Sequence, residues 1–147
     1  MSATLKDYPV TVTFPVHWSE MDAYGHVNNA RHFVWFESAR ITYLTRIGLV
    51  NTGHSGLGPI LAATNADYLL PVVFPATLVA GARVSRIGRS SITMEYAIAD
   101  ADKGTLHARG GGVIVTMRYP EYEKVPVPTQ VRAAIEALEG RSFEPPA

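Results

Sequence analysis

A single long helical pattern, in a chain whose other apolar segments alternate as strands do, restricts the folds open to this sequence. From Asn29 to Ile47 apolar residues recur with the period of a helix and fall within one arc. Asn28 is a favourable N-cap, and Gly48 is placed to end the helix. The predicted apolar face consists of Ala30, Phe33, Val34, Phe36, Ile41, Leu44 and Ile47.

Five segments are predicted to be strands. Residues 8–18 alternate with a period of two and are rich in β-branched and aromatic side chains. Four further strands are predicted at 60–70, 77–87, 92–99 and 106–119, with turn-forming residues between them. The stretch 50–59 is predicted to be a loop, and 131–138 a short terminal helix. One long helix and five mostly antiparallel strands predict an α+β fold in which a curved sheet wraps round the apolar stripe of the helix.

Three consecutive glycines, Gly110 to Gly112, interrupt the last predicted strand. Glycine inside a strand costs conformational entropy and removes side chains that would pack. The run therefore predicts a sharp bend of the sheet or the close approach of another backbone, with an ordinary bulge as the alternative.

Composition limits the classes of function. At 147 residues with 47% hydrophobic content, the chain is predicted to form one domain over residues 1–147. The net charge is zero, which argues against nucleic acid or an anionic membrane as a partner. No cysteine is present, so a disulfide framework, a thiol nucleophile and a thiolate metal site are excluded. No signal-peptide pattern or membrane-spanning apolar run is present, and we expect a cytoplasmic protein.

Reactive polar groups are concentrated where the long helix is predicted to begin. Asp22, Gly25 and His26 are followed by Val27 and two asparagines, directly before the amphipathic run. The free amides at a helix N-terminus favour negative charge, so a carboxylate and a histidine beside them indicate a small catalytic or binding site.

The spacing Asp22-x-x-Gly-His-Val-Asn-Asn29, followed by Phe36-Glu-x-Ala-Arg40, resembles the 4-hydroxybenzoyl-CoA thioesterase-like branch of the hotdog-fold acyl-CoA thioesterases. The similarity continues through Asp67-Tyr-Leu-Leu-Pro71 and Ile87-Gly-Arg-Ser-Ser91, and covers about residues 10–119. It implies a five-stranded antiparallel hotdog sheet and a homodimer or homotetramer with acyl sites at the interface. It also implies hydrolysis of acyl-CoA without a cofactor, since coenzyme A is part of the substrate.

Each residue of the motif has a structural and a catalytic interpretation. Asp22 either forms an Asx turn or acts as base or nucleophile on the thioester, and we favour the second. His26 either ties down the loop or orients water and stabilises charge. Asn28 and Asn29 cap the helix, and the resemblance assigns an oxyanion-binding backbone amide to Asn29. The predicted catalytic residues are therefore Asp22, His26 and Asn29.

A second group of residues is predicted to bind the substrate. Arginines with neighbouring hydroxyls suit the phosphate groups of coenzyme A, and the resemblance places this turn near the nucleotide. The predicted substrate-binding residues are Tyr24, Gly25, Asn28, Arg86, Arg89, Ser90 and Ser91. Glu37, inside the apolar arc, is predicted to pair with Arg40. The remaining histidines (His17, His32, His54 and His107) lack metal-ligand spacing, and no metal is expected.

Three other functions remain open at this point. An acyl carrier protein thioesterase shares much of the Asp22 to Asn29 pattern. A hotdog dehydratase or hydratase would place a histidine and a carboxylate across a hydroxyacyl chain. A non-catalytic acyl-CoA-binding module would not need Asp22. The sequence does not determine which acyl group is bound.

Overall fold

The computed structural model describes residues 5–50 and 56–145, so His54 lies outside the described part. The elements are β1 (Val10–Pro15), the 3₁₀ helix η2 (Trp18–Glu20), α1 (Ala30–Arg46), β2 (Gly56–Tyr68), β3 (Thr77–Ile87), β4 (Ser91–Asp100), β5 (Leu106–Tyr119), β6 (Glu123–Lys124) and α2 (Thr129–Glu139). Neither α1 nor α2 combines the length and the apolar character needed to span a bilayer.

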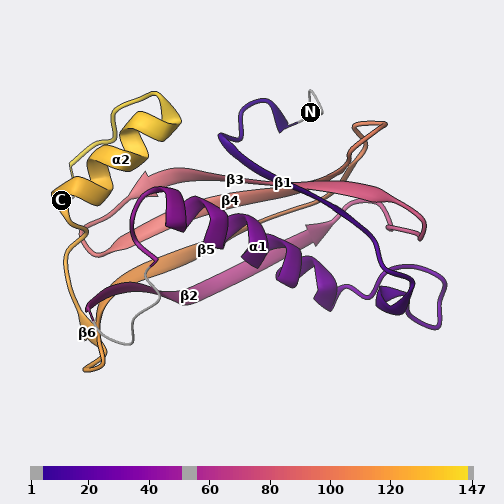
Figure 1. Cartoon of the computed structure of the whole chain (residues 1–147), viewed down its shortest axis with the longest axis horizontal. Coiled ribbons are helices and arrows are strands. Elements are labelled where there is room, and N and C mark those ends of the chain that lie inside the picture. The colour runs from indigo at the N-terminus through magenta and orange to yellow at the C-terminus, as the bar shows by residue number, and fades with distance from the viewer. Residues whose placement is uncertain (1–4, 51–55, 146–147) are drawn as a thin grey trace.

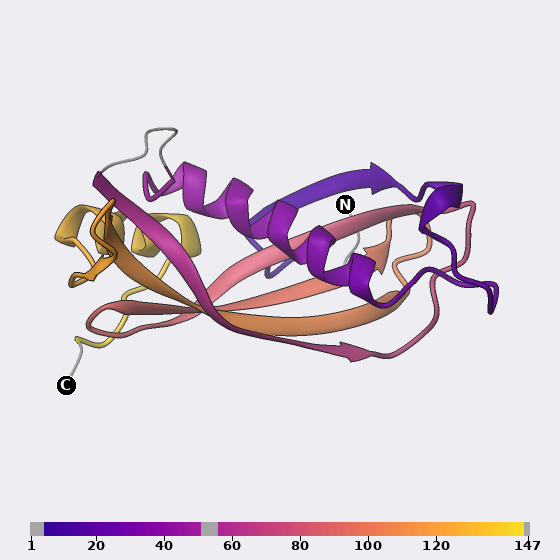
Figure 2. The ribbon, with the colours of Figure 1, turned by 90° about the horizontal axis from the view of Figure 1, so that it is seen from below.

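The strands form one antiparallel sheet in the order β1-β3-β4-β5-β2, to which the short β6 adds beside β5. The sheet curves round α1, which lies across its concave face (Figures 1 and 2). The predicted α+β hotdog fold, with a curved sheet wrapped round a long helix, is confirmed. The loop before α1 lies at one end of the sheet and α2 at the other (Figure 1).

The buried face of α1 differs from the predicted arc. The residues that it buries are His32, Trp35, Phe36, Ala39, Arg40, Tyr43 and Leu44. Phe33, Val34 and Ile41, which were predicted to face the core, are 36%, 41% and 41% exposed. The helix packs over β1, β3 and β4, as when Trp35 contacts Phe14 and Phe36 stacks on Tyr96. The core therefore includes His32, Arg40 and Tyr43, which a pattern of apolar residues does not identify. The flank of α1 with Phe33, Val34 and Ile41 stays exposed.

Strand β2 begins at Gly56, so the predicted loop is wrong for residues 56–59. Gly58 allows the close approach of Tyr119, whose ring would lie 3.0 Å from a Cβ at Gly58. The Tyr119 hydroxyl also donates to the Pro59 carbonyl oxygen at 2.8 Å. Because β2 is an edge strand, Pro59 is accommodated without breaking the sheet.

The predicted close approach at the glycine run is confirmed. A Cβ at Gly110 would lie 2.3 Å from the Asn65 carbonyl oxygen and 2.7 Å from the Phe36 ring. A Cβ at Gly112 would lie 2.9 Å from the Ala63 carbonyl oxygen. The register shift falls on β2, between Leu61 and Ala63, and not on the glycines. The glycines therefore let α1 and β2 close tightly on β5.

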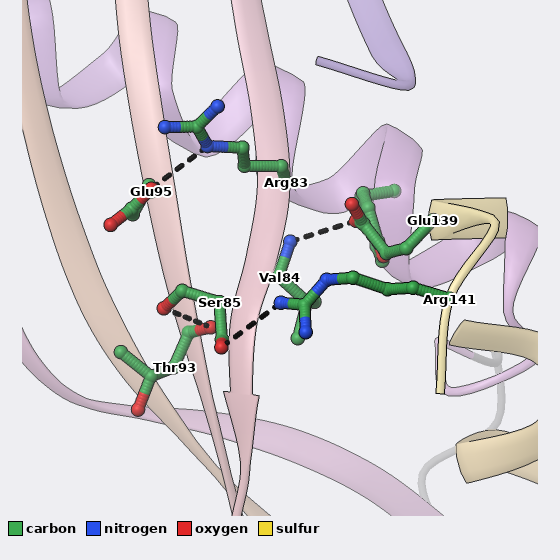
Figure 3. Close-up of polar contacts among 8 residues, drawn as sticks. Arg83, Val84, Ser85, Thr93, Glu95, Glu139 and Arg141 are labelled. Carbon is green, nitrogen blue, oxygen red and sulfur yellow. Dashed lines mark hydrogen bonds and ion pairs between the residues drawn. The ribbon is translucent and has the colours of Figure 1, made fainter. Parts of the chain in front are cut away.

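The C-terminal helix α2 is fastened to the sheet and to α1 by one carboxylate. Glu139 Oε2 accepts hydrogen bonds from the Tyr43 hydroxyl at 2.5 Å and from the Val84 amide at 2.9 Å. Figure 3 shows Glu139 reaching β3 beside Arg141, which donates to the Ser85 carbonyl oxygen at 3.2 Å. Burial, together with the Glu139 carboxylate, raises the pKa of Tyr43 far above its ordinary value, so this hydroxyl keeps its proton.

Candidate active site

The loop before α1 is held by Glu20, which the sequence did not single out. Its carboxylate accepts hydrogen bonds from the His17 amide at 2.8 Å and from Arg31 Nε at 3.0 Å. Burial alone would raise the pKa of Glu20, but these bonds outweigh it and the pKa lies below its ordinary value. The Glu20 carbonyl oxygen also accepts from the Asn28 amide at 3.0 Å. An ionised, buried carboxylate thus joins η2 to the start of α1 and fixes the loop between them.

Within this loop, Asp22 uses its two carboxylate oxygens differently. Oδ1 accepts a hydrogen bond from the Tyr24 amide at 2.8 Å, which is an Asx turn. Oδ2 lies 3.4 Å from His26 Nδ1. The Asp22 amide donates to the His26 carbonyl oxygen at 2.8 Å, and Gly25 takes the φ of 89° that closes the turn. The structural interpretation of Asp22 is therefore correct for one oxygen, while the other oxygen pairs with His26.

The start of α1 presents an amide without an acceptor. The Asn28 side chain accepts from the Ala30 amide at 2.9 Å, so Asn28 does cap the helix. No residue in 5–50 or 56–145 accepts a hydrogen bond from the Asn29 amide. The Asn29 carbonyl oxygen accepts from the Tyr68 hydroxyl at 3.0 Å and from the His32 amide at 3.2 Å. The Asn29 peptide is thus fixed on its carbonyl side while its N–H is free to donate.

These groups meet in a cleft of about 400 Å³. It brings together Asp22, His26 and Asn29, the three residues predicted to be catalytic. The other lining residues come from the loop before α1, from α1, from the end of β2 and from the segment after it: Val27, His32, Tyr68, Leu69, Leu70, Pro71 and Val72. Residues 69–72, in the segment after β2, are apolar. The cleft therefore has polar groups at the start of α1 and, opposite them, a surface suited to an apolar group.

His32 and Tyr68 are site residues that sequence reasoning missed. The His32 side chain is 4% exposed, its ring lies 4.9 Å from Tyr68 and 4.8 Å from Trp35, and within the described chain Nδ1 has no hydrogen-bond partner. Burial, with a smaller effect from His107, holds the pKa of His32 below its ordinary value, although the backbone of Asn29 and Asn28 acts to raise it, so the ring is neutral at physiological pH. Tyr68 lies in the Asp67 to Pro71 motif, which was the available signal.

The predicted substrate-binding residues divide into two groups. Tyr24, Gly25 and Asn28 flank the cleft, and Tyr24 is 88% exposed. The other group lies at and around the turn between β3 and β4: Arg86 at the end of β3, Arg89 and Ser90 in the turn, and Ser91 at the start of β4. Arg86 also lies next to the chain that follows α2. Because β3 has 11 residues, that turn lies roughly 30 Å from the Asp22 end of the sheet. One chain therefore does not bring the two groups into the same cleft.

The donor groups of the site do not form a metal cluster. Across residues 5–50 and 56–145, no three His, Asp or Glu side chains are arranged to hold a metal ion. The pairing of His26 with Asp22 leaves an imidazole and a carboxylate beside a free amide, which are groups for proton transfer and for binding an oxyanion.

Comparison with known proteins shows which family the chain belongs to. Residues 16–135 match the family model of the thioesterase-like superfamily. The chain belongs to that superfamily. The matched range includes the loop with Asp22, all of α1 and the main strands other than β1.

Solved structures and a curated relative extend the comparison. A thioesterase from Thermus thermophilus, complexed with coenzyme A and Zn, is 35% identical, with a TM-score of 0.80 over 92% of this chain and 98% of that chain. A thioesterase superfamily protein from Jannaschia sp. CCS1 is 25% identical, with a TM-score of 0.84 over 91% of this chain and 85% of that chain. The uncharacterized protein YsmA of Bacillus subtilis is 32% identical over 81 residues, which are 55% of this chain and 54% of YsmA. The chain thus spans about half the length of that relative.

Proposed function

We propose that this protein is an acyl-CoA thioesterase that hydrolyses a thioester to a free carboxylic acid and coenzyme A. The observation that carries the proposal is the cleft at the start of α1, which the Asp22 carboxylate lines together with the unoccupied amide of Asn29. A base or nucleophile beside an oxyanion donor is what acyl transfer to water requires. Membership of the thioesterase-like superfamily supports it.

In the proposed reaction the thioester carbonyl oxygen points at the Asn29 amide. Asp22 either removes a proton from water as it attacks the carbonyl carbon, or attacks that carbon itself to give a mixed anhydride that water then opens. The negative charge that develops on the carbonyl oxygen is stabilised by the Asn29 N–H and by the dipole of α1. The carbon–sulfur bond breaks, and the thiolate of coenzyme A takes up the proton.

Neighbouring groups position the Asp22 carboxylate and the Asn29 amide. Tyr24 and His26 contact the two oxygens of the Asp22 carboxylate at 2.8 and 3.4 Å and restrict its rotation. The Tyr68 hydroxyl, donating to the Asn29 carbonyl oxygen, orients the start of α1 beside the cleft. In this proposal His26 and Tyr68 are positioning residues, and Asp22 and the Asn29 amide touch the reacting atoms.

The ligand is proposed to extend in two directions. The wall formed by residues 69–72 receives an apolar acyl group. Coenzyme A is favoured as the carrier because the similar Thermus thermophilus thioesterase is named as a complex with it. Its phosphates are assigned to Arg86, Arg89, Ser90 and Ser91.

The assignment of the phosphates requires a homodimer. The turn after β3 lies at the far end of the same chain, so it must approach the cleft of a second chain. The edge strand β2, 13 residues long and largely exposed, offers the surface for such an assembly. A dimer and a tetramer of such dimers both satisfy this requirement.

A panel of acyl-CoA thioesters, scored by release of free thiol, tests the function. We expect hydrolysis of at least one acyl-CoA, with kcat reduced by roughly 100-fold or more in Asp22→Asn. Crotonyl-CoA is included because loss of its double bond without thiol release would indicate a hydratase. A wild-type protein that binds acyl-CoA but releases no thiol across the panel would overturn the proposal in favour of a binding module.

A further inference from the structure

Glu20 bonds to both ends of the loop that leads into α1. The residue is 7% exposed. Its carboxylate accepts from the His17 amide at 2.8 Å on one side of the loop and from Arg31 Nε at 3.0 Å on the other. Its carbonyl oxygen accepts from the Asn28 amide at 3.0 Å, and the Trp35 side chain also hydrogen-bonds to the carboxylate. One buried side chain thus fixes where α1 begins relative to η2.

The direction of the Asn29 amide depends on Arg31. The N–H of Asn29 and the carbonyl of Asn28 belong to one planar trans peptide group, so they point in opposite directions. That carbonyl oxygen accepts from the Arg31 amide at 3.0 Å, in the first turn of α1. Glu20 therefore holds the side chain of the residue whose backbone orients the Asn29 N–H.

Glu20 and Arg31 are placed to support the site and not to react. Neither side chain lines the cleft that contains Asp22. Both oxygens of the Glu20 carboxylate accept hydrogen bonds, as a buried charge requires. By contrast, the predicted pair of Glu37 with Arg40 is present on α1 at 3.5 Å, but its carboxylate is 62% exposed. The Glu20 contact is thus the more rigid of these two ion pairs, because water cannot readily replace its donors.

We propose that Glu20 is a positioning residue for hydrolysis, which acts through Arg31 to keep the Asn29 amide directed into the cleft. This inference rests on the proposed function, in which that amide binds the thioester oxygen. A donor stabilises an oxyanion only when it lies within hydrogen-bond distance of the oxygen as charge develops. A small rotation of the peptide therefore lowers kcat, while binding of the acyl group to the apolar wall is retained.

A purely structural role of Glu20 predicts a different result. If Glu20 only fastens η2 to α1, loss of its bond to Arg31 lowers the melting temperature. The molecules that remain folded then hydrolyse the substrate at the wild-type rate. The value of kcat, measured well below the melting temperature of each variant, therefore separates positioning from stability.

Glu20→Gln tests the proposal, because the amide keeps the size of the side chain and replaces one acceptor oxygen with a donor. We expect kcat for the most active acyl-CoA of the panel to fall at least about 10-fold, with KM within about twofold of wild type. Circular dichroism confirms the fold. The matched control is Glu95→Gln, which removes a bond of the same kind, from Arg83 Nε at 2.8 Å, between β3 and β4 outside the cleft. The control should leave kcat unchanged.

A second substitution shows whether Glu20 acts through Arg31. Arg31→Met keeps the apolar stem of a side chain that is 44% exposed, so it should fold, and we expect it to lower kcat as well. Because both substitutions break the same contact, the double variant should lose no more activity than the more impaired single variant. Losses that multiply would overturn the action through Arg31.

The remaining outcomes separate this proposal from the proposed function. An active wild type with unchanged kcat in folded Glu20→Gln and Arg31→Met would overturn the positioning role and leave hydrolysis standing. If Glu20→Gln does not fold, Arg31→Met decides alone. A wild type that releases no thiol from any acyl-CoA would overturn both.

Discussion

The polar groups at the two ends of α1 differ in whether they have hydrogen-bond partners. At its C-terminal end, the Tyr43 hydroxyl and the Val84 amide both donate to Glu139, so these buried groups have partners. At its N-terminal end, within the described chain, the Asn29 amide and Nδ1 of His32 have no partner, and Asp22 lines a cleft. Buried polar groups are nearly always satisfied in the native state. Nδ1 of His32 departs from this rule within the described chain, and the Asn29 amide lies on an exposed residue. The N-terminal end of α1 is therefore where a ligand can add hydrogen bonds.

The contrast separates stability from function along one helix. We call the C-terminal end of α1, where Glu139 satisfies its neighbours, the closed end, and the N-terminal end, which lines the cleft, the open end. The closed end fastens α2 to the rest of the molecule (Figure 3) and contributes to the free energy of unfolding. The N-terminal end leaves the Asn29 amide and Nδ1 of His32 without partners in the described chain. Substitutions at the two ends should accordingly change different measured quantities.

The largest effect is expected at the open end, for Asp22→Asn. The amide keeps the shape of the side chain and can still accept from Tyr24 through its oxygen, but it is neither base nor nucleophile. We expect kcat for acyl-CoA hydrolysis to fall by roughly 100-fold or more, with the melting temperature nearly unchanged. Thiol release and a thermal melt on the same preparation measure both. A well-folded variant with near-wild-type turnover would contradict the assignment of Asp22.

The closed end should respond to Glu139→Ala in the opposite manner. The truncation leaves the Tyr43 hydroxyl and the Val84 amide buried without an acceptor. We expect the free energy of unfolding to fall by about 2–4 kcal/mol, with kcat at a temperature where the variant is folded remaining close to wild type. Urea unfolding measures the change, and Glu121→Ala, on an exposed turn, is the matched control. An equal loss from both substitutions would remove the distinction between the two ends.

Contacts between residues close together in the sequence could be predicted, and contacts between residues far apart in the sequence could not. Asp22, His26 and Asn29 meet through one turn and one helix start, so a short motif was sufficient to place them in one cleft. The contact of Tyr68 with Asn29 spans 39 residues and that of Glu139 with Tyr43 spans 96, and both depend on how the sheet curves. Local patterns do not contain that information.

The fold shows the same division. The curved sheet and the long helix were predictable because period and turn chemistry act over short stretches. The buried face of α1 was not, because His32, Arg40 and Tyr43 enter the core through contacts with Tyr68, Tyr96 and Glu139. The proposed roles of the catalytic and phosphate-binding residues stay predictions until the variants are measured.

A smaller effect is expected for His32→Phe at the open end. The ring is buried beside Tyr68 and Trp35, and no hydrogen bond of Nδ1 within the described chain is lost, so stability at pH 7.5 should change by less than about 1 kcal/mol. Burial holds the pKa of His32 in the folded state below its ordinary value of 6.5. As the pH falls below about 6.5, the unfolded chain takes up the proton first and the wild type loses stability.

His32→Phe should therefore flatten the acid side of the stability curve. Urea unfolding between pH 7.5 and 5 measures this, and the slope that disappears is at most about 1.4 kcal/mol per pH unit. His17→Phe, at an exposed histidine of the same chain, is the control and should leave the slope in place. A large loss of stability at pH 7.5 would mean that Nδ1 has a structural partner after all.

The smallest effect is expected for Arg89, in the turn after β3. A substitution here tests whether Arg89 of one chain binds the substrate held in the cleft at the N-terminal end of α1 of another chain. The side chain of Arg89 is exposed, while its carbonyl oxygen accepts from the Val127 amide at 2.7 Å and holds the turn. Arg89→Glu reverses the charge without touching that backbone bond. If Arg89 contacts a phosphate of coenzyme A, KM for an acyl-CoA should rise several-fold, by up to about 1 kcal/mol of binding energy, with kcat nearly constant. The same acyl group on a short thiol without the nucleotide should show no change, because the lost contact is absent from that substrate. Equal increases in KM for both substrates would assign Arg89 to the shape of the turn, and the two ends of α1 would then be independent in function as well as in stability.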